Sequence, residues 1–285
     1  MDKGDQGREH QARMSSTAES YEVYAVRYAS MQRQRRDNFF PADAHDGPMP
    51  MDFFVWLLRS RNRAVLVDTG FAAAAERRRQ LLRCPIEALR VLGVDPAGIT
   101  DVILTHLHYD HAGNLGKLPN ARFHLQDAEL DYATGRCMCH GVLRHAYSVE
   151  DIVAMVRNVY ADRVVFHAGD QPGVFPGIDL LLIGGHTRGL QSVRVSTARG
   201  RVVLASDAAH YYENLERELP FPIVCNVADM IAGHRRVMAA ADSPDHVVPG
   251  HDPEVLKRYP RLAGDDVGIA CLHQRPVVSQ GSAAL

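Results

Sequence analysis

Short runs of apolar residues, rich in β-branched and aromatic side chains, recur between polar segments along this chain, a pattern typical of β-strands. Three such runs come early, starting at Tyr21, Asp52 and Arg63, and they read YEVYAVRYA, DFFVWLL and RAVLVDTG. Residues 76–93 (ERRRQLLRCPIEALRVLG) place apolar residues at helical spacing instead, and Gly93 is suited to end a helix there. We therefore expect a sheet that starts the fold, followed by one or two helices.

The rest of the pattern predicts a second group of strands and helices. The run ITDVILTH, from Ile99, is typical of a buried strand, and residues 127–162 are rich in helical patterns. Strands are expected at RVVFH, IDLLLIG, SVRVSTA and RVVLASD, and helices around VADMIAGHRRVMAAA and after Pro253. Because strands and helices come in groups without strict βαβ alternation, we predict an α/β fold, an αββα sandwich of two mixed sheets flanked by helices.

Length and composition fit one globular domain. The chain has 285 residues, enough to bury a large core. Residues 1–20 and 273–285 have the composition of flexible tails. We expect a single domain over residues 21–272, with a helical insert at about 127–162.

Charge and cysteine usage narrow the class of protein. Lys and Arg number 32 against 34 Asp and Glu, so neither a nucleic-acid nor a membrane partner is expected. The N-terminus lacks a signal-peptide core and no stretch is long enough to cross a bilayer, which makes a cytoplasmic location our expectation. The five cysteines are scattered, so they are expected to be reduced. Cys137 and Cys139 form only a weak metal-binding pattern, and packed thiols are the favoured interpretation.

Four potential metal ligands lie within six positions after an apolar strand, in the segment THLHYDHAG: His106, His108, Asp110 and His111. Side chains at i and i+2 of an extended segment point to the same side, so His106 and His108 can converge on one ion. Asp110 and His111, where the chain turns, can reach a second ion. Imidazole and carboxylate suit zinc and similar metals, and the lack of nearby thiolates disfavours a closed structural site. The segment predicts an open, catalytic site.

Three later segments supply further ligands. GGHT, ASDA and PGHD each follow an apolar run, and they place His186, Asp207 and His251 at predicted strand ends. Taken singly, each of these residues is more often part of a turn. As a set that follows the first motif, they complete two coordination spheres.

The pattern H-x-H-x-D-H followed by isolated His, Asp and His resembles the metallo-β-lactamase superfamily, from about Tyr21 to Tyr259. The resemblance implies two divalent ions per chain, with zinc expected and iron, manganese or cobalt as alternatives. It implies that one ion is held by His106, His108 and His186, that the other is held by Asp110, His111 and His251, and that Asp207 bridges them. It also implies that Asp68, in the VDTG run, supports the ligand loop, although a helix cap after Gly70 is an alternative.

Within the superfamily, the PMPMDFFVWLL and ASDAAHYYEN segments are similar to the N-acyl homoserine lactonase family, the quorum-quenching enzymes. This implies opening of a lactone ring by a hydroxide that bridges the metals, with Asp110 shuttling the proton. The family usually has Tyr three residues after the bridging Asp, where this chain has His210 and then Tyr211. We expect one of these two to contact the substrate carbonyl, and Tyr211 is favoured because a phenol donates without first being protonated.

Substrate contacts are expected from four residues: Tyr109, which lies between two ligands, and Met49, Met51 and Trp56, whose apolar side chains suit an acyl group. Such apolar residues more often belong to a core. The segment from Arg136 to Tyr160 is interpreted either as a cover over the metals or as a packed helix pair.

The expected partner is a small lactone or ester, and a homodimer is left open. One alternative is another hydrolase of this fold, acting on a different lactone, ester, thioester, amide or phosphodiester. A second is an iron-dependent oxidoreductase, which is disfavoured because di-iron members typically have Glu where this chain has His108. A non-catalytic binding protein would need a degraded ligand set, whereas all seven ligands are present.

Overall fold

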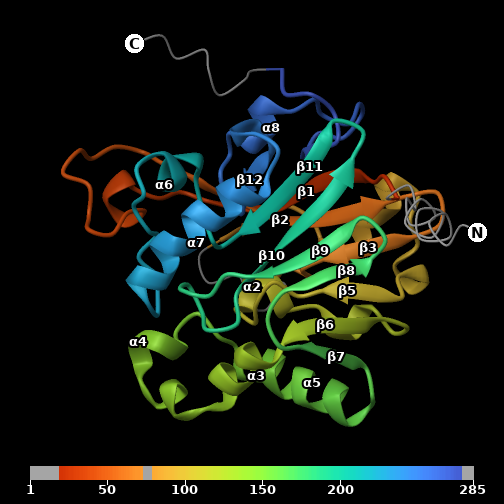
Figure 1. Cartoon of the computed structure of the whole chain (residues 1–285), viewed down its shortest axis with the longest axis horizontal. Helices are drawn as coiled ribbons and strands as arrows, with labels where there is room; N and C mark the ends of the chain where they lie inside the picture. Colours follow the sequence, from red (N-terminus) through yellow and green to blue (C-terminus); the bar gives the residue numbers. More distant parts are fainter. Residues whose placement is uncertain (1–18, 73–78, 278–285) are drawn as a thin grey trace, which may run out of the picture.

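The structure, a computed structural model, describes residues 19–72 and 79–277. Its strands form two sheets that lie against each other, and helices cover the outer faces (Figure 1). This arrangement confirms the predicted αββα sandwich. The predicted tails fall largely outside the described residues. Within those residues, no helix combines the length and apolar character needed to cross a bilayer.

The first sheet has the strand order β13-β1-β2-β3-β5-β6-β7, and the short β4 pairs with β1. Strands β3, β5, β6 and β7 run parallel to one another, whereas β1 pairs antiparallel with β2, β4 and β13, and β2 pairs antiparallel with β3. The bounds are β1 Glu22–Met31, β2 Met51–Arg59, β3 Ala64–Val67, β4 Gln80–Leu81, β5 Asp101–Ile103, β6 Arg122–Gln126, β7 Val164–His167 and β13 Ile269–Cys271.

The second sheet has the order β12-β11-β10-β9-β8. Its strands pair antiparallel except for β11 and β12, which are parallel. The bounds are β8 Gln171–Phe175, β9 Ile178–Leu182, β10 Gln191–Thr197, β11 Gly200–Ser206 and β12 Val247–Pro249.

The alternation of side chains along β2 explains how the layers are held together. Phe53 and Val55 belong to the core under the helices, whereas Phe54, Trp56 and Leu58 belong to the core between the sheets. All five are at most 2% exposed. Because successive strand residues point to opposite faces, a strand that is apolar on both faces must lie inside a layered fold.

Helices pack on both outer faces of the sandwich (Figure 1). The α-helices are α2 Tyr109–Ala112, α3 Asp127–Thr134, α4 Gly141–Arg144, α5 Val149–Tyr160, α6 Tyr212–Glu216, α7 Val227–Ala240 and α8 Val255–Arg258. The 3₁₀ helices are η2 Arg35–Asp37, η4 Glu87–Leu92, η5 Pro96–Gly98, η6 Leu115–Lys117, η7 Arg136–Cys139 and η8 Pro244–His246. On the second sheet, Met230 and Val237 of α7 pack against Val203 of β11 and Val247 of β12.

The predicted helix over residues 76–93 is wrong in its described first half. Gln80 and Leu81 form β4 and pair with Ser30 and Ala29 of β1. Pro85 follows, where a helix would lack a backbone N–H donor. The second half is the short η4, which ends as expected at Gly93 in the left-handed conformation, at φ 73°. Residues 73–78 lie outside the described residues.

Candidate metal centre

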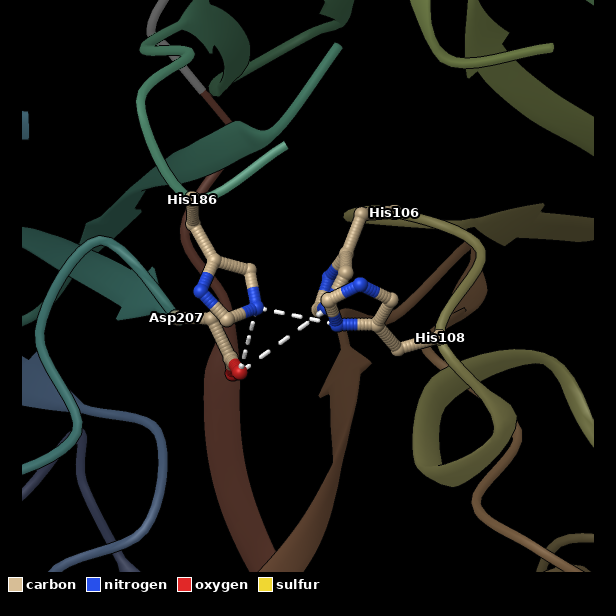
Figure 2. Close-up of side chains that lie close together, drawn as sticks. All are labelled: His106, His108, His186 and Asp207. Carbon is tan, nitrogen blue, oxygen red and sulfur yellow. Dashed lines mark hydrogen bonds and ion pairs between the residues drawn. The ribbon is translucent and has the colours of Figure 1, made fainter. Parts of the chain in front are cut away.

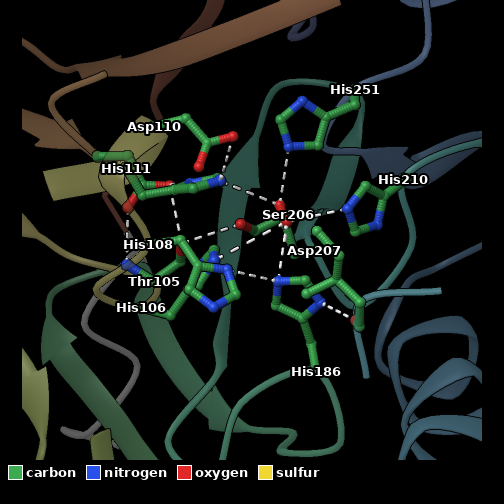
Figure 3. Close-up of polar contacts among 12 residues, drawn as sticks. Thr105, His106, His108, Asp110, His111, His186, Ser206, Asp207, His210 and His251 are labelled. Carbon is green, nitrogen blue, oxygen red and sulfur yellow. Dashed lines mark hydrogen bonds and ion pairs between the residues drawn. The ribbon is translucent and has the colours of Figure 1, made fainter. Parts of the chain in front are cut away.

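The seven predicted ligands come together where strands of both sheets end (Figure 3). The HLHYDH segment follows β5 of the first sheet. His186 follows β9, Asp207 follows β11 and His251 follows β12, all in the second sheet. Ligand-type side chains that are far apart in sequence therefore meet at one edge of the sandwich.

Two groups of these side chains have ligand atoms within 4.8 Å of one another. The first group is His106, His108, His186 and Asp207 (Figure 2), and the second is Asp110, His111 and His251. They are the two sets that the sequence assigned to separate ions, with the bridging Asp207 in the first. A third group joins Asp207 and His251 to His210.

The carboxylate of Asp207 lies between the two groups. Its Oδ1 is 3.0 Å from Nε2 of His251 and 3.2 Å from Nε2 of His111. Its Oδ2 is 3.1 Å from Nε2 of His186 and 3.8 Å from Nε2 of His106. Each oxygen therefore faces a different group, which is the geometry of a carboxylate shared between two ions.

In His186 and His251, the ring nitrogen that faces away from Asp207 shows which nitrogen carries the proton. Nδ1 of His186 lies 2.6 Å from the carbonyl oxygen of Ile223, and Nδ1 of His251 lies 2.9 Å from that of Asp52. A carbonyl only accepts, so each Nδ1 must donate, and a neutral ring then has a lone pair on Nε2. These lone pairs point at the oxygens of Asp207. Electron-pair donors that face one another in this way need a cation between them.

Of the seven candidate ligands, two have a buried ring nitrogen with no hydrogen-bond partner among the described residues: Nε2 of His106 and Nε2 of His111. Burial, and then the neighbouring His111, hold the pKa of His106 well below its usual value, so its ring is neutral. Burial, and then His186, lower the pKa of His108 in the same way. The neutral imidazoles of His106 and His108 suit a divalent metal ion, whereas burial, which lowers the pKa of His111, is outweighed by Asp207, Asp68 and Asp110, which raise it. A cation beside these carboxylates is favoured in either case, and the cluster therefore fits a metal ion.

Asp68 holds the ligand loop in place. Its Oδ1 accepts a hydrogen bond from the Thr105 backbone at 2.7 Å, and its Oδ2 accepts from the Thr105 hydroxyl at 2.8 Å. Oδ2 is also 2.7 Å from Nδ1 of His111. Both Asp68 and Ser206 have left-handed backbone, at φ 61° and 49°. Strained backbone of this kind persists where the surroundings over-determine it.

The backbone at Gly250 packs closely against the end of β11, which carries Asp207. A Cβ added at Gly250 would lie 2.8 Å from the backbone carbonyl of Ser206 and 3.1 Å from Oδ1 of Asp207. A side chain at position 250 would therefore push the strand end that carries Asp207 away from His251. This contact explains the glycine before His251 in PGHD.

Glu129 of α3 joins the two ligand loops, and sequence reasoning missed it. Its Oε1 accepts from the backbone of Leu107 at 2.9 Å and from the Tyr147 hydroxyl at 3.0 Å. Its Oε2 accepts from the backbone of Gly189 at 3.1 Å. The Tyr147 ring also contacts the His108 ring edge-on, at 4.6 Å between centroids. One buried carboxylate thus fixes loops from both sheets.

A cavity of about 350 Å³ opens onto the centre. Predicted residues on its wall include Met51, Tyr109, Asp110 and His210, and the helical insert contributes His145 and Ala146. The wall also includes Arg33, Arg79, Phe221, Pro222 and Ile223, which the sequence did not single out. These residues come from distant loops, and no local motif marks them.

His210 and Tyr211 point in different directions. Nε2 of His210 is 3.1 Å from Oδ2 of Asp207, while its Nδ1 is buried without a partner. Burial lowers the pKa of His210 to about 3, so the ring is neutral and donates from Nε2. The Tyr211 hydroxyl donates to the carbonyl oxygen of Pro50 at 3.3 Å, and Tyr211 lines a neighbouring cavity instead. The geometry favours His210 over Tyr211, contrary to our sequence-based preference.

Other predicted contacts do not reach the metal-centre cavity. Trp56 is fully buried between the sheets, and Met49 lines the same neighbouring cavity as Tyr211. These two predicted substrate contacts are therefore not supported by the structure. Cys137 and Cys139 are free thiols on η7, and neither belongs to a potential metal cluster among the described residues.

Comparisons of this sequence with known proteins and with a family model agree with one another. The model of the metallo-beta-lactamase superfamily matches residues 54–261. An N-acyl homoserine lactonase from Bacillus sp is 30% identical over 190 residues, which cover 60% of this chain and 70% of that protein. An N-acyl homoserine lactonase from Rhizobium radiobacter is 26% identical over 178 residues, which cover 61% of this chain and 66% of that protein.

Solved structures share the architecture. A quorum-quenching N-acyl homoserine lactone hydrolase superposes with a TM-score of 0.67 at 25% identity, covering 85% of this chain and 95% of that chain. A dizinc quorum-quenching lactonase in complex with a product superposes with a TM-score of 0.63 at 16% identity, covering 83% and 92%. The second likeness concerns the fold alone.

Proposed function

Because the chain belongs to the metallo-β-lactamase superfamily, we propose that it is a metal-dependent hydrolase that opens lactone rings, with N-acyl homoserine lactones as the first substrates to try. The observation that carries this proposal is the set of histidine lone pairs directed at Asp207 beside an open cavity. A catalytic metal site needs such an open side. The 30% identity to N-acyl homoserine lactonases supports the choice of a lactone.

We assign two divalent ions to the centre. His106, His108 and His186 would hold one ion and Asp110, His111 and His251 the other, with Asp207 shared between them. The two oxygens of Asp207, each facing a different group, support the shared position. Nitrogen and oxygen ligands without thiolates favour zinc, which a dizinc relative in fold also contains.

A bound pair of such ions supplies an acidified water and polarises a substrate carbonyl. The chain itself provides the proton transfer. The carboxylate of Asp110 lies on the cavity wall, 3.9 Å from Nε2 of His111. In this position it accepts a proton from the attacking water and returns it to the ring oxygen as the C–O bond breaks. Hydrolysis then leaves a carboxylate and a free hydroxyl.

His210 and the apolar wall orient the lactone. The Nε2–H of His210 lies at the cavity wall and donates to Oδ2 of Asp207. When bound ions engage that carboxylate, the N–H would be available to donate to the carbonyl oxygen as negative charge develops. Tyr109, Met51 and Phe221 offer apolar surface for the acyl part. Burial keeps the His210 ring neutral, so donation does not depend on protonation near neutral pH.

The test combines elemental analysis with a substrate panel. Protein purified without added metal should contain about two ions per chain, because seven ligands exceed what one tetrahedral ion uses. The panel pairs short- and long-chain acyl homoserine lactones with acyclic esters, thioesters, amides and phosphodiesters. Faster turnover of lactones than of every acyclic substrate supports the proposal. A single ion that leaves Asp207 and His251 uncoordinated would defeat the two-metal assignment.

A further inference from the structure

Two arginines line the metal-centre cavity, and each stacks on an aromatic ring of the same wall. The guanidinium carbon of Arg33 lies 5.1 Å from the ring centroid of Phe221. That of Arg79 lies 4.9 Å from the ring centroid of Tyr109. Such stacking orients a guanidinium and leaves its edge available for hydrogen bonds.

A series of contacts leads from Arg33 through the Phe221 ring to the metal centre. The Phe221 ring stacks on the His210 ring, with centroids 3.7 Å apart and planes at 8°. His210 in turn contacts Asp207. Arg33 is thus separated from the metal centre by the thickness of Phe221 and His210, a distance that a small substrate spans.

Arg33 is bound only to neutral acceptors. Its Nε donates to Oδ1 of Asn38 at 2.6 Å, and its Nη2 donates to the backbone carbonyl of Asp37. Over residues 19–72 and 79–277, no carboxylate forms an ion pair with it. Burial lowers the pKa of Arg33 and Arg79 acts in the same direction, whereas Tyr211 and Asp37 act against it. A partly buried guanidinium beside a second one is costly without an anion bound to it.

Neighbouring arginines of the same loop are neutralised. Arg35 pairs with Asp43 at 3.1 Å and also with Glu213. Arg36 pairs with Asp46 at 3.2 Å. The chain therefore supplies carboxylates to the two arginines that face away from the cavity, and none to the one that lines it.

We propose that Arg33, with Arg79 beside it, binds an oxyanionic group, a carboxylate or a phosphate, at the end of the substrate farthest from the scissile ester. The proposal rests on the proposed hydrolase function and narrows its substrates to anionic lactones or esters. Guanidinium groups match the geometry of both oxyanions. Bound metal ions add positive charge to the same cavity and favour anionic substrates further.

The activity test uses homoserine lactones that differ only in the end of the acyl chain. One carries the terminal carboxylate of a succinyl group, one a terminal phosphate and one the neutral succinamoyl amide. The wild-type chain should prefer one or both charged lactones over the amide by about tenfold in kcat/KM, the size expected for a charge-assisted hydrogen bond. The better of the two identifies the anion. Equal rates for all three would overturn the proposal.

Variants assign the preference to Arg33. Arg33→Gln should abolish the preference for the charged lactones over the neutral amide, and Arg33→Lys should retain part of it. Arg36→Gln is the matched control, from the same loop and outside the cavity, and should keep the full preference. Melting temperature and metal content of each variant identify any general damage. A preference that survives Arg33→Gln in a folded, metal-loaded protein contradicts the proposal.

A binding experiment separates this inference from the proposed function. Calorimetry compares succinate with butyrate, which has the same chain length but one carboxylate. The metal-loaded wild-type chain should bind succinate about tenfold more tightly, and Arg33→Gln should remove the difference. If no lactone is hydrolysed but this difference is present, the proposed reaction fails and the anion site stands. If lactones are hydrolysed and the difference is absent, the anion site fails alone.

Discussion

The histidines of the metal centre differ in what holds the ring nitrogen that faces away from it. His186 and His251 are held by backbone carbonyls, and His111 is held by the carboxylate of Asp68. Nδ1 of His210 has no partner. A ring that is held on one side is pre-oriented to coordinate on the other, and the His210 ring lacks this support at Nδ1.

Replacing Asp68 with Asn should weaken metal binding by about 10–100-fold. The amide keeps the size of the side chain but cannot accept from Thr105 and His111 at every position that the carboxylate uses. Competition with a chromophoric chelator measures the affinity. Asp265→Asn is the control, since Asp265 pairs with Arg83. Equal affinities for the two variants would show that Asp68 does not support the ligands.

His210→Ala should lower lactone turnover by roughly 10²–10³-fold with metal content retained, because an oxyanion donor is lost. Tyr211→Phe should leave turnover nearly unchanged, since its hydroxyl contacts the Pro50 carbonyl outside the cavity. Steady-state kinetics and elemental analysis of both variants provide the test. Full activity of His210→Ala would mean that the carbonyl is activated by metal alone. Loss of metal from that variant would make His210 a ligand instead.

Asp110→Asn should reduce turnover by about 10²-fold or more, because the amide cannot take up the proton of the attacking water. Stability should change less than turnover, since the ion pair of this carboxylate with Nε2 of His111 is long, at 3.9 Å. Thermal melts and kinetics on the same preparation compare the two effects. Unchanged turnover would remove Asp110 from the proposed proton transfer.

At the scale of elements, helix α3 fixes the metal centre through a single side chain. Glu129→Gln replaces one carboxylate oxygen with an NH₂ group, so that either Leu107 and Tyr147 or Gly189 lose their acceptor. We expect a loss of about 1–3 kcal/mol in the free energy of unfolding, the cost of leaving buried polar groups unsatisfied. Denaturant titration measures it. Tyr147→Phe removes one donor only and should cost less; an equal or larger cost would contradict this ranking.

Some of the short strands could not be predicted from the local sequence pattern. The long runs at β1, β2, β10 and β11 were predicted because their apolar pattern repeats over seven or more residues. Strand β13 has three residues, too few for a periodic signal. Gln80 and Leu81 look helical locally and become β4 only because β1 offers them backbone partners. Pairing between distant segments is information that a local pattern lacks.

At the scale of the whole molecule, buried neutral histidines make stability depend on pH. His234 of α7 is 2% exposed, and burial lowers its pKa from 6.5 to about 4. Below pH 6.5, His234 is therefore protonated in the unfolded chain, whereas in the folded chain it stays neutral until about pH 4. Stability from this residue is full above pH 6.5 and falls as pH drops through that window, by roughly 3 kcal/mol.

His234→Leu should flatten this part of the pH profile of the melting temperature. Met230→Leu, on the same helix and without a titratable group, controls for repacking. Because other buried histidines titrate too, the difference between the two variants from pH 7 to pH 4 is the quantity to compare. Identical slopes would exclude His234 as a source of acid sensitivity.

The sequence located the metal cluster well and its surroundings poorly, for one physical reason. Four ligand-type residues within six positions are visible locally, and the later His, Asp and His each follow a recognisable strand. Arg33, Phe221 and Glu129 have no such local mark, because their function comes from tertiary placement. Trp56 shows the converse, since a residue suited to a binding pocket packs between the sheets instead.

The convergence of both sheets on one cluster has a consequence for biosynthesis. A ribosome releases the chain from its N-terminus, so His106 to His111 emerge long before His251. A nascent chain thus exposes a partial, histidine-rich chelating segment while the carbonyls and carboxylates of the second sheet are still unmade. Tight, selective metal uptake becomes available only when β12 docks beside β11 and brings in His251. The chain would then acquire its metal only after the last ligand, His251, has been synthesised and has folded into place.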